Sequence, residues 1–277
     1  MEDIEFEHSL LLKEITEIRA VHPRIGGRKL YIMLQDFMQE HQIKMGRDKF
    51  FDLLSMYGLL VKKRKRRVHT TNSFHWLKKY DNLIERFEAD RHNQLWVSDI
   101  TYWKVAGKYT YISLITDAYS RKIVGYQLWE TLEAEGCIRA LKKAISGLLS
   151  RPDDCFELIH HSDRGIQYCS KEYTQMLKDN QIQISMTQNG DPLENAIAER
   201  VNGILKDEYL MEYQPKDIRQ ASQYLDQAVE LYNNHRPHLS IDYHTPEQVH
   251  QTDIKTARAW KNYYPEKNNA VKLEQDY

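Results

Sequence analysis

The sequence of 277 residues lacks the features that mark secreted, membrane-spanning or disordered proteins. Its three cysteines, Cys137, Cys155 and Cys169, are far apart and form no CxxC pair, which is typical of reduced thiols in a cytosolic protein. No stretch approaches about 18 consecutive apolar residues, and the acidic N-terminus lacks the basic start of a secretory signal. Only 11 glycines and 7 prolines occur, and 41% of the residues are hydrophobic. We therefore expect a folded cytoplasmic protein with one large domain or two modest ones.

The formal net charge of −1 conceals a difference between the two parts of the chain. Residues 1–80 carry 16 Lys and Arg against 10 Asp and Glu, a balance of +6. Residues 81–277 carry 23 against 30, a balance of −7. A basic N-terminal part joined to an acidic remainder suits a polyanion-binding arm on a metal-binding body. A solvated surface with uneven charge explains the same numbers equally well.

Three short amphipathic segments in the basic part predict helices at residues 7–21, 28–40 and 47–57. The segment HPRIGGR separates the first two, and Gly58 follows the third where a helix C-cap is expected. Three helices with tight turns suit a helix-turn-helix module whose last helix enters a major groove of DNA. An ordinary three-helix bundle has the same pattern.

Six consecutive positive charges follow these helices. They are Lys62, Lys63, Arg64, Lys65, Arg66 and Arg67. Such a run repels itself unless a polyanion neutralises it, so we predict contacts with DNA phosphates and a salt-dependent affinity. The alternative is a flexible basic linker. We predict a helical DNA-binding module at residues 1–68, a linker at 69–90, an α/β core at 91–250 and a C-terminal tail at 251–277.

The residue pattern changes from helix to strand after residue 90. Runs rich in β-branched and aromatic residues predict strands at 95–105, 109–116, 122–129, 156–161 and 182–186. The first hairpin turn is expected at Gly107 and Lys108. Helical segments are expected at about 132–149, 170–179, 194–211 and 216–234. This order predicts an α/β fold with a mixed five-stranded sheet and helices on its faces.

Asp99 lies in the middle of the first predicted strand. Alternate residues of a strand share a face, so Asp99 shares its face with apolar Val97 and Trp103. A charge on such a face is costly unless it is paired or binds a metal ion. A salt bridge to a buried Lys or Arg is the alternative.

Asp163 comes directly after the fourth predicted strand, in the segment HHSDRGIQY. The carboxyl ends of strands are where ligand-binding residues gather in α/β sheets. Gly165 gives the following turn conformational freedom. An Asx-turn or a helix cap would also account for an aspartate here.

Glu199 lies on a predicted helix, together with Asn195, Asn202 and Lys206 at helical spacing. This polar stripe is suited to facing a bound ligand, although most such stripes are solvated helix faces. Asp99, Asp163 and Glu199 would then come from two strand positions and one helix of a single domain. Such a cluster repels itself without divalent cations, and its hard oxygen ligands favour Mg²⁺ or Mn²⁺. Two such ions would serve an in-line phosphoryl displacement.

Three segments of the core, WVSDITY, HSDRGIQY and NAIAERVNGILKDE, resemble the carboxylate motifs of the retroviral-integrase superfamily. More closely, the chain resembles the second-reading-frame product of insertion-sequence transposases. In that family 35 residues separate the last two carboxylates, as residues 164–198 do here, and a lysine follows the glutamate by seven residues, as Lys206 follows Glu199. The segments HPRIGGRKL and YNNHRPHLSIDYHTPEQV extend the resemblance over nearly the whole chain.

The resemblance implies an RNase H-like integrase catalytic core and a DDE transposase that acts in DNA recombination and integration. Asp99, Asp163 and Glu199 are then the catalytic residues and the ligands of two Mg²⁺ or Mn²⁺ ions. The enzyme would cleave the ends of a mobile element and transfer the freed 3′-hydroxyl strand to target DNA. Two departures from the family pattern are Glu194, where aspartate is usual, and GGR, which replaces a more aromatic pattern around the same glycine.

The same resemblance implies a set of partners. Lys206 would contact DNA phosphate, with Asn195 and Asn202 on the same helix face. The substrates would be double-stranded DNA, namely the terminal inverted repeats of the element and the target. We expect a homo-oligomer on DNA, no membrane partner, and an upstream-frame product that supplies a further DNA-binding segment.

Other functions fit parts of the same sequence. A DNA-binding regulator would use the helical module and the basic run without chemistry, and a ribonuclease of the same fold would act on RNA–DNA hybrids. A retroviral integrase proper needs an N-terminal His/Cys zinc site, and no cysteine precedes Cys137. The adjacent His160 and His161, and His235 and His238 of the HRPH segment, are better explained by structural hydrogen bonds than by zinc binding.

Overall fold

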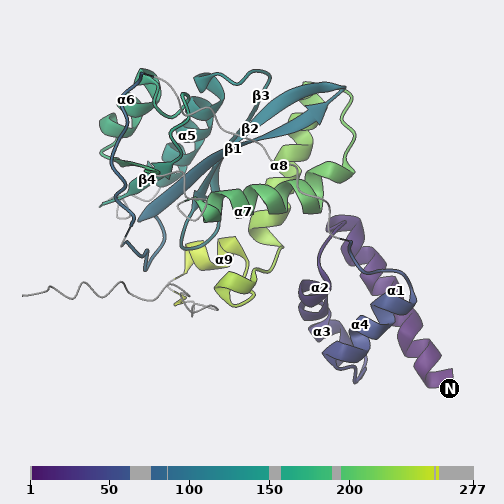
Figure 1. Cartoon of the computed structure of the whole chain (residues 1–277). Helices are drawn as coiled ribbons and strands as arrows, with labels where there is room; N and C mark the ends of the chain where they lie inside the picture. The colour runs from purple at the N-terminus through teal and green to yellow at the C-terminus, as the bar shows by residue number, and fades with distance from the viewer. Residues whose placement is uncertain are drawn as a thin grey trace, which may run out of the picture.

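The computed structural model describes residues 2–62, 76–85, 87–149, 157–188, 195–252 and 254–255. The helices of the N-terminal part are α1 (Glu2–Val21), α2 (Gly27–Met33), α3 (Gln35–Glu40) and α4 (Arg47–Met56). They enclose a core of their own, which includes Leu11, Leu30, Leu34 and Phe50. Figure 1 shows these helices as a separate bundle beside the larger α/β body. The predicted helix-turn-helix-like module is therefore all-α, as expected.

Two details of this bundle concern where its helices end. The helix expected at 28–40 is divided at Leu34, whose torsions (φ −89°, ψ −3°) interrupt the helix while its side chain stays buried in the shared core. The apolar spacing continues across the break, so the sequence pattern does not reveal it. Gly58, at φ +65°, follows the last helix in the left-handed conformation that favours glycine.

The α/β body is built on a five-stranded mixed sheet in the order β3-β2-β1-β4-β5. Its strands are β1 (Leu95–Val105), β2 (Lys108–Asp117), β3 (Ile123–Trp129), β4 (Ile159–Ser162) and β5 (Gln183–Met186). The first three form an antiparallel meander, and β4 and β5 run parallel to β1. This is the RNase H-like arrangement that the sequence predicted. The first hairpin turn, however, lies at Ala106 and Gly107 (φ +47° and +84°), because Lys108 already pairs with Val105.

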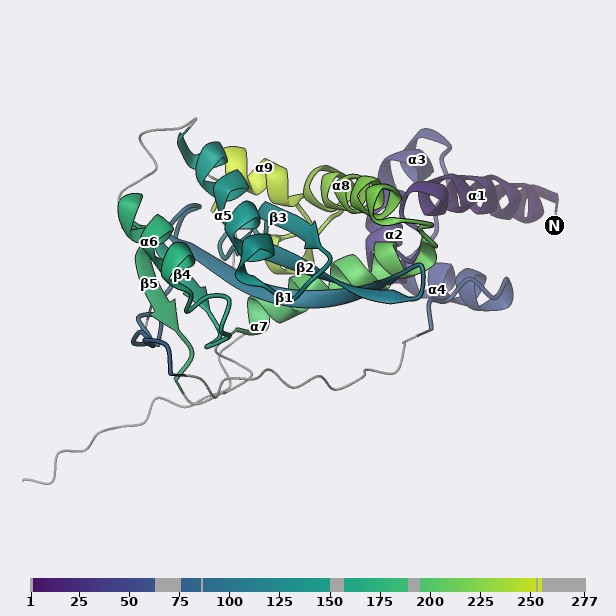
Figure 2. The same cartoon turned by 90° about the horizontal axis from the view of Figure 1, so that it is seen from above.

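Helices cover both faces of the sheet (Figures 1 and 2). On one face, α5 (Ala134–Leu149) and α6 (Lys171–Asp179) pack over a core that includes Trp96 of β1. On the other, α7 (Ala196–Ile204) and α8 (Ile218–Asn234) pack over a second core that includes Trp103. Even and odd positions of β1 thus point to opposite layers. Asp99 belongs to the odd set, which faces α7.

The helix expected at 194–211 is not continuous. After α7 the chain forms the π-helical turn η2 (Leu205–Tyr209) and then the 3-10 turn η3 (Leu210–Glu212). A π-helical turn is wider than an α-helical one. Leu205, Tyr209 and Leu210 are all buried against the second core along this stretch.

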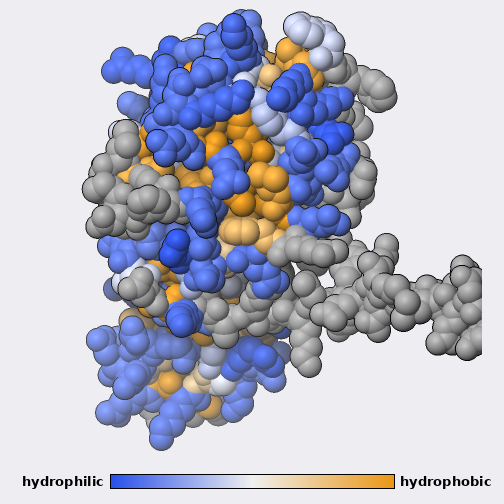
Figure 3. All heavy atoms as spheres, turned by 90° about the vertical axis from the view of Figure 1, so that its left-hand side faces the viewer, coloured by the Kyte–Doolittle hydropathy of each residue, from blue (hydrophilic) through white to orange (hydrophobic). Residues whose placement is uncertain are grey.

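The C-terminal signature segment also has structure that the sequence pattern left unassigned. It contains the short turn η4 (Leu239–Ile241) and the helix α9 (Pro246–Gln251). A capping box starts α9, because the Thr245 hydroxyl accepts from the Gln248 backbone and the Gln248 side chain accepts from the Thr245 backbone. Across the part of the chain that the structure describes, no helix is long and apolar enough to cross a membrane. Figure 3 shows a largely hydrophilic surface with some apolar residues exposed on the body.

Candidate active site

Asp99 and Asp163 lie on neighbouring strands at the centre of the sheet. Strand β4 pairs with β1 in parallel register, with Ser162 opposite Ser98. Asp99 and Asp163 are the next residue along each strand. The two carboxylates therefore leave the sheet side by side, where its central parallel pairing ends, as expected for ligand-binding residues of α/β sheets.

The Asp99 carboxylate is partly buried beneath α7. One oxygen accepts a hydrogen bond from the Ile100 amide at 2.9 Å, and the other accepts from the Asn202 side chain at 2.8 Å. The pKa of Asp99 is raised from 3.8 to about 7, mainly by burial and also by the negative charges of Asp163 and Glu199, while the two hydrogen bonds act to lower it. The folded protein therefore disfavours the ionised form of Asp99.

Asp163 begins a tight turn after β4. Its Oδ1 accepts a hydrogen bond from the Gly165 amide at 2.9 Å, which is the Asx-turn that the sequence left as an alternative. Gly165 has no positive φ here. Instead, a Cβ at this position would lie 2.9 Å from Asp163 Oδ1. Glycine is thus needed for the close approach and not for conformational freedom.

Glu199 lies in the first turn of α7 and its side chain is exposed. The helix crosses the sheet over β1, and the charge of Glu199 contributes to the raised pKa of Asp99. Asp163 and Glu199 therefore both lie within electrostatic reach of Asp99. Within the described ranges, no three His, Cys, Asp or Glu side chains are gathered tightly enough to hold a metal ion.

The chemistry of these residues fits a divalent cation. All three side chains offer hard oxygen ligands, which Mg²⁺ and Mn²⁺ prefer. The negative charges of Asp163 and Glu199 make it less favourable for Asp99 to ionise, and a cation bound beside them would favour ionisation instead.

Asn195 and Asn202 are buried and point at β1. Asn195 donates to the Ser98 carbonyl at 3.0 Å, and Asn202 donates to Asp99. Their side-chain oxygens are buried without a hydrogen-bond partner among the described residues. These amides hold α7 against the strand that carries Asp99, a role that the predicted polar stripe did not reveal. Their predicted contacts with DNA stay a prediction.

Lys206, in the π-helical turn, places its ammonium over the ring of Tyr102 at 4.0 Å from the centroid. This is a cation–π contact with a residue of β1. Partial burial lowers the pKa of Lys206. The contact holds the lysine beside the sheet, and its predicted contact with phosphate stays a prediction.

Of the predicted basic run, only Lys62 lies within the described residues, whereas residues 63–67 lie outside them. The Lys62 carbonyl accepts a hydrogen bond from Arg24 at 2.7 Å.

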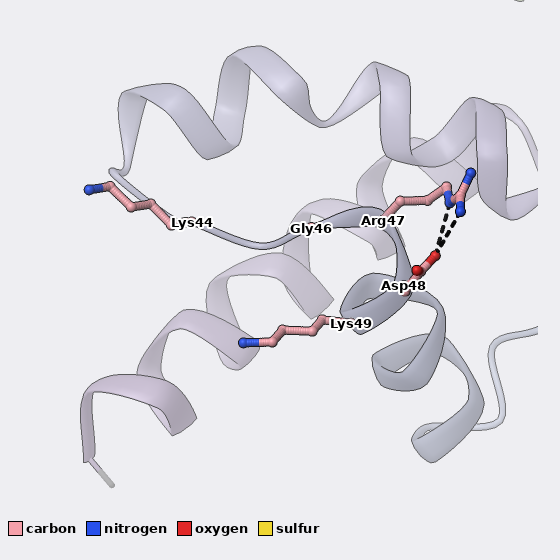
Figure 4. A pocket seen from close by; sticks show the side chains of 5 residues that line it. All are labelled: Lys44, Gly46, Arg47, Asp48 and Lys49. Carbon is pink, nitrogen blue, oxygen red and sulfur yellow. Dashed lines mark hydrogen bonds and ion pairs between the residues drawn. The ribbon is translucent and has the colours of Figure 1, made fainter.

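A second group of basic residues was not identified from the sequence. Figure 4 shows Lys44, Gly46, Arg47, Asp48 and Lys49 around a hollow at the start of α4, with Arg47 paired to Asp48 at 2.9 Å and the two lysines extending to one side. Three cations within residues 44–49 were the signal that could have found it.

The adjacent histidines of the HHSD segment are buried beneath the site. His160 Nε2 lies 2.6 Å from the Ser98 hydroxyl and 2.9 Å from the Tyr173 hydroxyl, and burial lowers its pKa to about 3. His161 Nδ1 lies 2.8 Å from the Ser185 hydroxyl. These contacts join β1, β4, β5 and α6, so they stabilise the sheet just below the carboxylates.

The sheet order is that of an integrase-type core, and comparisons of the sequence agree. Two family profiles, both described as "Integrase core domain", match residues 89–192 and 180–246. Together they span the region from before β1 through η4.

Relatives along most of the chain are encoded by insertion elements. The chain is 32% identical over 241 residues to the insertion element IS600 uncharacterized 31 kDa protein of Shigella sonnei, covering 85% of this chain and 87% of that one. It is 31% identical to the transposase for insertion sequence element IS629 of Shigella sonnei, covering 82% and 74% respectively. The chain belongs to this family of insertion-sequence transposases with an integrase core.

A solved structure extends the likeness of fold beyond the core. The simian T-cell lymphotropic virus intasome in complex with PP2A regulatory subunit B56 gamma matches 90% of this chain and 79% of its own chain, at a TM-score of 0.51 and 16% identity. At this identity the match shows a shared fold. The insertion-element relatives, and not this match, show that the protein is a DNA transposase of the integrase family.

Proposed function

We propose that this transposase cleaves the ends of its element and joins the freed strand to target DNA, using Asp99, Asp163 and Glu199 as catalytic residues. The observation that carries the proposal is the pair of aspartates on adjacent strands, Asp99 within β1 and Asp163 just after β4, with Glu199 on the helix that crosses the same face. The raised pKa of Asp99 supports it, because structural aspartates are normally stabilised in their charged form by a partner.

Asp99, Asp163 and Glu199 would hold two Mg²⁺ or Mn²⁺ ions. When bound, such ions neutralise charge on the scissile phosphate and stabilise the attacking and leaving oxygens. In the first step, a water oxygen forms a bond to phosphorus and the 3′ oxygen of the element leaves as a hydroxyl. In the second, that hydroxyl attacks a target phosphate and displaces a target 3′ oxygen, which takes up the proton released by the attacking group. The protein forms no covalent bond to DNA.

The basic groups would bind the DNA on which this chemistry acts. The run Lys62–Arg67 and the residues Lys44 and Lys49 would contact phosphates, and Lys206 would contact DNA nearer the carboxylates. Both element ends must be held together for transposition, so we propose that a homo-oligomer assembles on double-stranded DNA. An upstream-frame product would add further end recognition.

The test is cleavage and strand transfer with DNA carrying the element's own terminal repeats. Asp99→Asn, Asp163→Asn and Glu199→Gln should each lower both rates by at least 1,000-fold, as expected for loss of a metal ligand (~4 kcal/mol in the barrier). DNA binding in a mobility-shift assay should persist. Asp179→Asn, at the exposed end of α6, is the matched control and should keep full activity. Full activity of Glu199→Gln would refute the assignment, and preferential cleavage of an RNA–DNA hybrid would indicate a ribonuclease instead.

A further inference from the structure

The N-terminal bundle rests on the end of the helix that carries Glu199. In both Figure 1 and Figure 2, α1 and α2 lie beyond the C-terminal end of α7. The contacts there are polar and specific. His22, just after α1, lies with Nδ1 2.9 Å from the Tyr209 hydroxyl, and the two rings meet edge to face at 5.9 Å.

Charged contacts continue this interface. Lys29 of α2 lies 3.7 Å from Glu208, and Arg24 lies 3.7 Å from Glu212. Glu208 is in turn held by two hydrogen bonds of 2.6 and 2.7 Å from Arg236, which is 1% exposed and belongs to the C-terminal signature segment. We call η2 and η3, residues 205–212, the seat of the bundle.

The seat is continuous with the catalytic helix. The π-helical turn follows α7 without a break, and Leu205 and Tyr209 are buried in the core beneath it. Along α7 itself, Asn195 and Asn202 fix the helix to β1. Glu199 therefore stands on a helix anchored both to the sheet and at the seat, and the docked bundle adds polar contacts to the second anchor.

We propose that the docking of the N-terminal bundle on this seat positions the catalytic helix, with His22 and Tyr209 as the positioning pair. This inference rests on the proposed function, because it assigns the bundle a role at the proposed catalytic site. His22 is 3% exposed and Tyr209 is 1% exposed, so the hydrogen bond between them is shielded from water. Losing either partner leaves a buried polar atom unsatisfied.

The physical consequence is a link between DNA binding and catalysis. DNA bound at Lys44 or Lys49 acts on the same bundle that carries His22 and Lys29. Any shift of that bundle is transmitted to η2, and through it to the helix that carries Glu199. The bundle would thereby bring Glu199 into place when DNA is correctly bound.

A double-mutant cycle in the full-length protein tests the docking. His22→Phe and Tyr209→Phe each remove the hydrogen bond and keep a ring, whereas His22→Asn keeps a polar atom close to the place of Nδ1. Hydrogen–deuterium exchange of metal-free protein at residues 22–30 and 205–212 should rise about ten-fold in each Phe variant, without change in α5. The double variant should add little to either single variant. Additive effects, or unchanged exchange, would overturn the docking pair.

The coupling to catalysis is tested with the same variants. The rate constant for end cleavage at saturating DNA should fall at least five-fold in His22→Phe and Tyr209→Phe, with little change in the DNA concentration giving half the maximal rate. His22→Asn should restore most of the rate. Loosened exchange with an unchanged cleavage rate would overturn the positioning role. Absence of cleavage in the wild-type protein would instead count against the proposed function, and the exchange result would still decide the docking.

Discussion

Replacing Asp99 by asparagine should stabilise the metal-free protein while abolishing its activity. The exchange removes the charge and preserves the shape, and the asparagine oxygen can still accept from the Ile100 amide or the Asn202 side chain. Burial, with the nearby charges of Asp163 and Glu199, raises the pKa of Asp99 from 3.8 to about 7. Ionisation of Asp99 is therefore less favourable in the folded protein than in the unfolded chain.

The size of the gain follows from the two pKa values. Below pH 3.8 the carboxyl is neutral in both states, and no penalty exists. As the pH rises toward 7, the unfolded chain loses its proton first, so the native state becomes progressively less stable relative to it. Above pH 7 the penalty is complete, with an upper limit of about 4 kcal/mol. Between pH 5 and pH 7.5 it should grow by about 2 to 3 kcal/mol.

The assay is urea unfolding of wild type and Asp99→Asn in EDTA at both pH values. The advantage of the variant should be about 1 to 2 kcal/mol at pH 5 and should rise to about 4 kcal/mol at pH 7.5. Asp179→Asn, in the exposed helix end, controls for the general effect of removing a carboxylate. Adding Mg²⁺ should then stabilise the wild type and not the variant, because only a protein that binds the ion in its native state gains from it. A variant less stable than wild type at pH 7.5 would show that Asp99 has a compensating structural partner, and the reasoning would fail.

Three further results are expected. Burial lowers the pKa of His22 from 6.5 to about 4, so the native protein should lose up to roughly 3 kcal/mol of stability as the pH falls from 6.5 through 4. In urea unfolding, the stability of His22→Asn should depend less steeply on pH than that of the wild type. An equal dependence of the two proteins on pH would contradict this. Asn202→Ala removes a hydrogen bond to a carboxylate and should lower the cleavage rate about 10- to 100-fold with intact DNA binding, since such bonds contribute about 1.5 to 3 kcal/mol. Neutralising residues 62–67 with glutamine should reduce the slope of log affinity against log salt by about 0.9 for each phosphate that the variant no longer neutralises; an unchanged slope would identify the run as a linker.

The sheet could be predicted from the sequence because its signals are local. Strand β1 was predicted with its observed bounds, since its β-branched and aromatic run ends at a glycine turn. The placement of Asp163 after β4 followed from an apolar run of only a few residues. Alternation along β1 also placed Asp99 on the face that α7 covers. These inferences needed no knowledge of distant contacts.

The parts that escaped prediction depend on distant contacts. Asn202 looked like a member of a ligand-facing stripe, and only the crossing of α7 over β1 shows that its amide points at Asp99. His22 and Tyr209 are 187 positions apart, and no local pattern pairs them. The turn η2 is hidden for a related reason, because apolar spacing continues through it while the hydrogen bonding changes. The helix α9 is different, since Thr245 and Pro246 were a readable start signal.

The unfavourable charge of Asp99 and the firm anchoring of α7 are related. A partly buried carboxylate with two carboxylates near it would push the covering helix away if that helix were held weakly. Asn202 offsets part of the repulsion by donating to Asp99 itself, and Asn195 holds the helix at Ser98. The far end is fixed by Glu208 and Arg236, an ion pair too deeply buried to break without cost. Glu199 is thus carried on a well-anchored helix within electrostatic reach of Asp99 while its own side chain stays exposed, which suits the role of metal ligand that we propose for it.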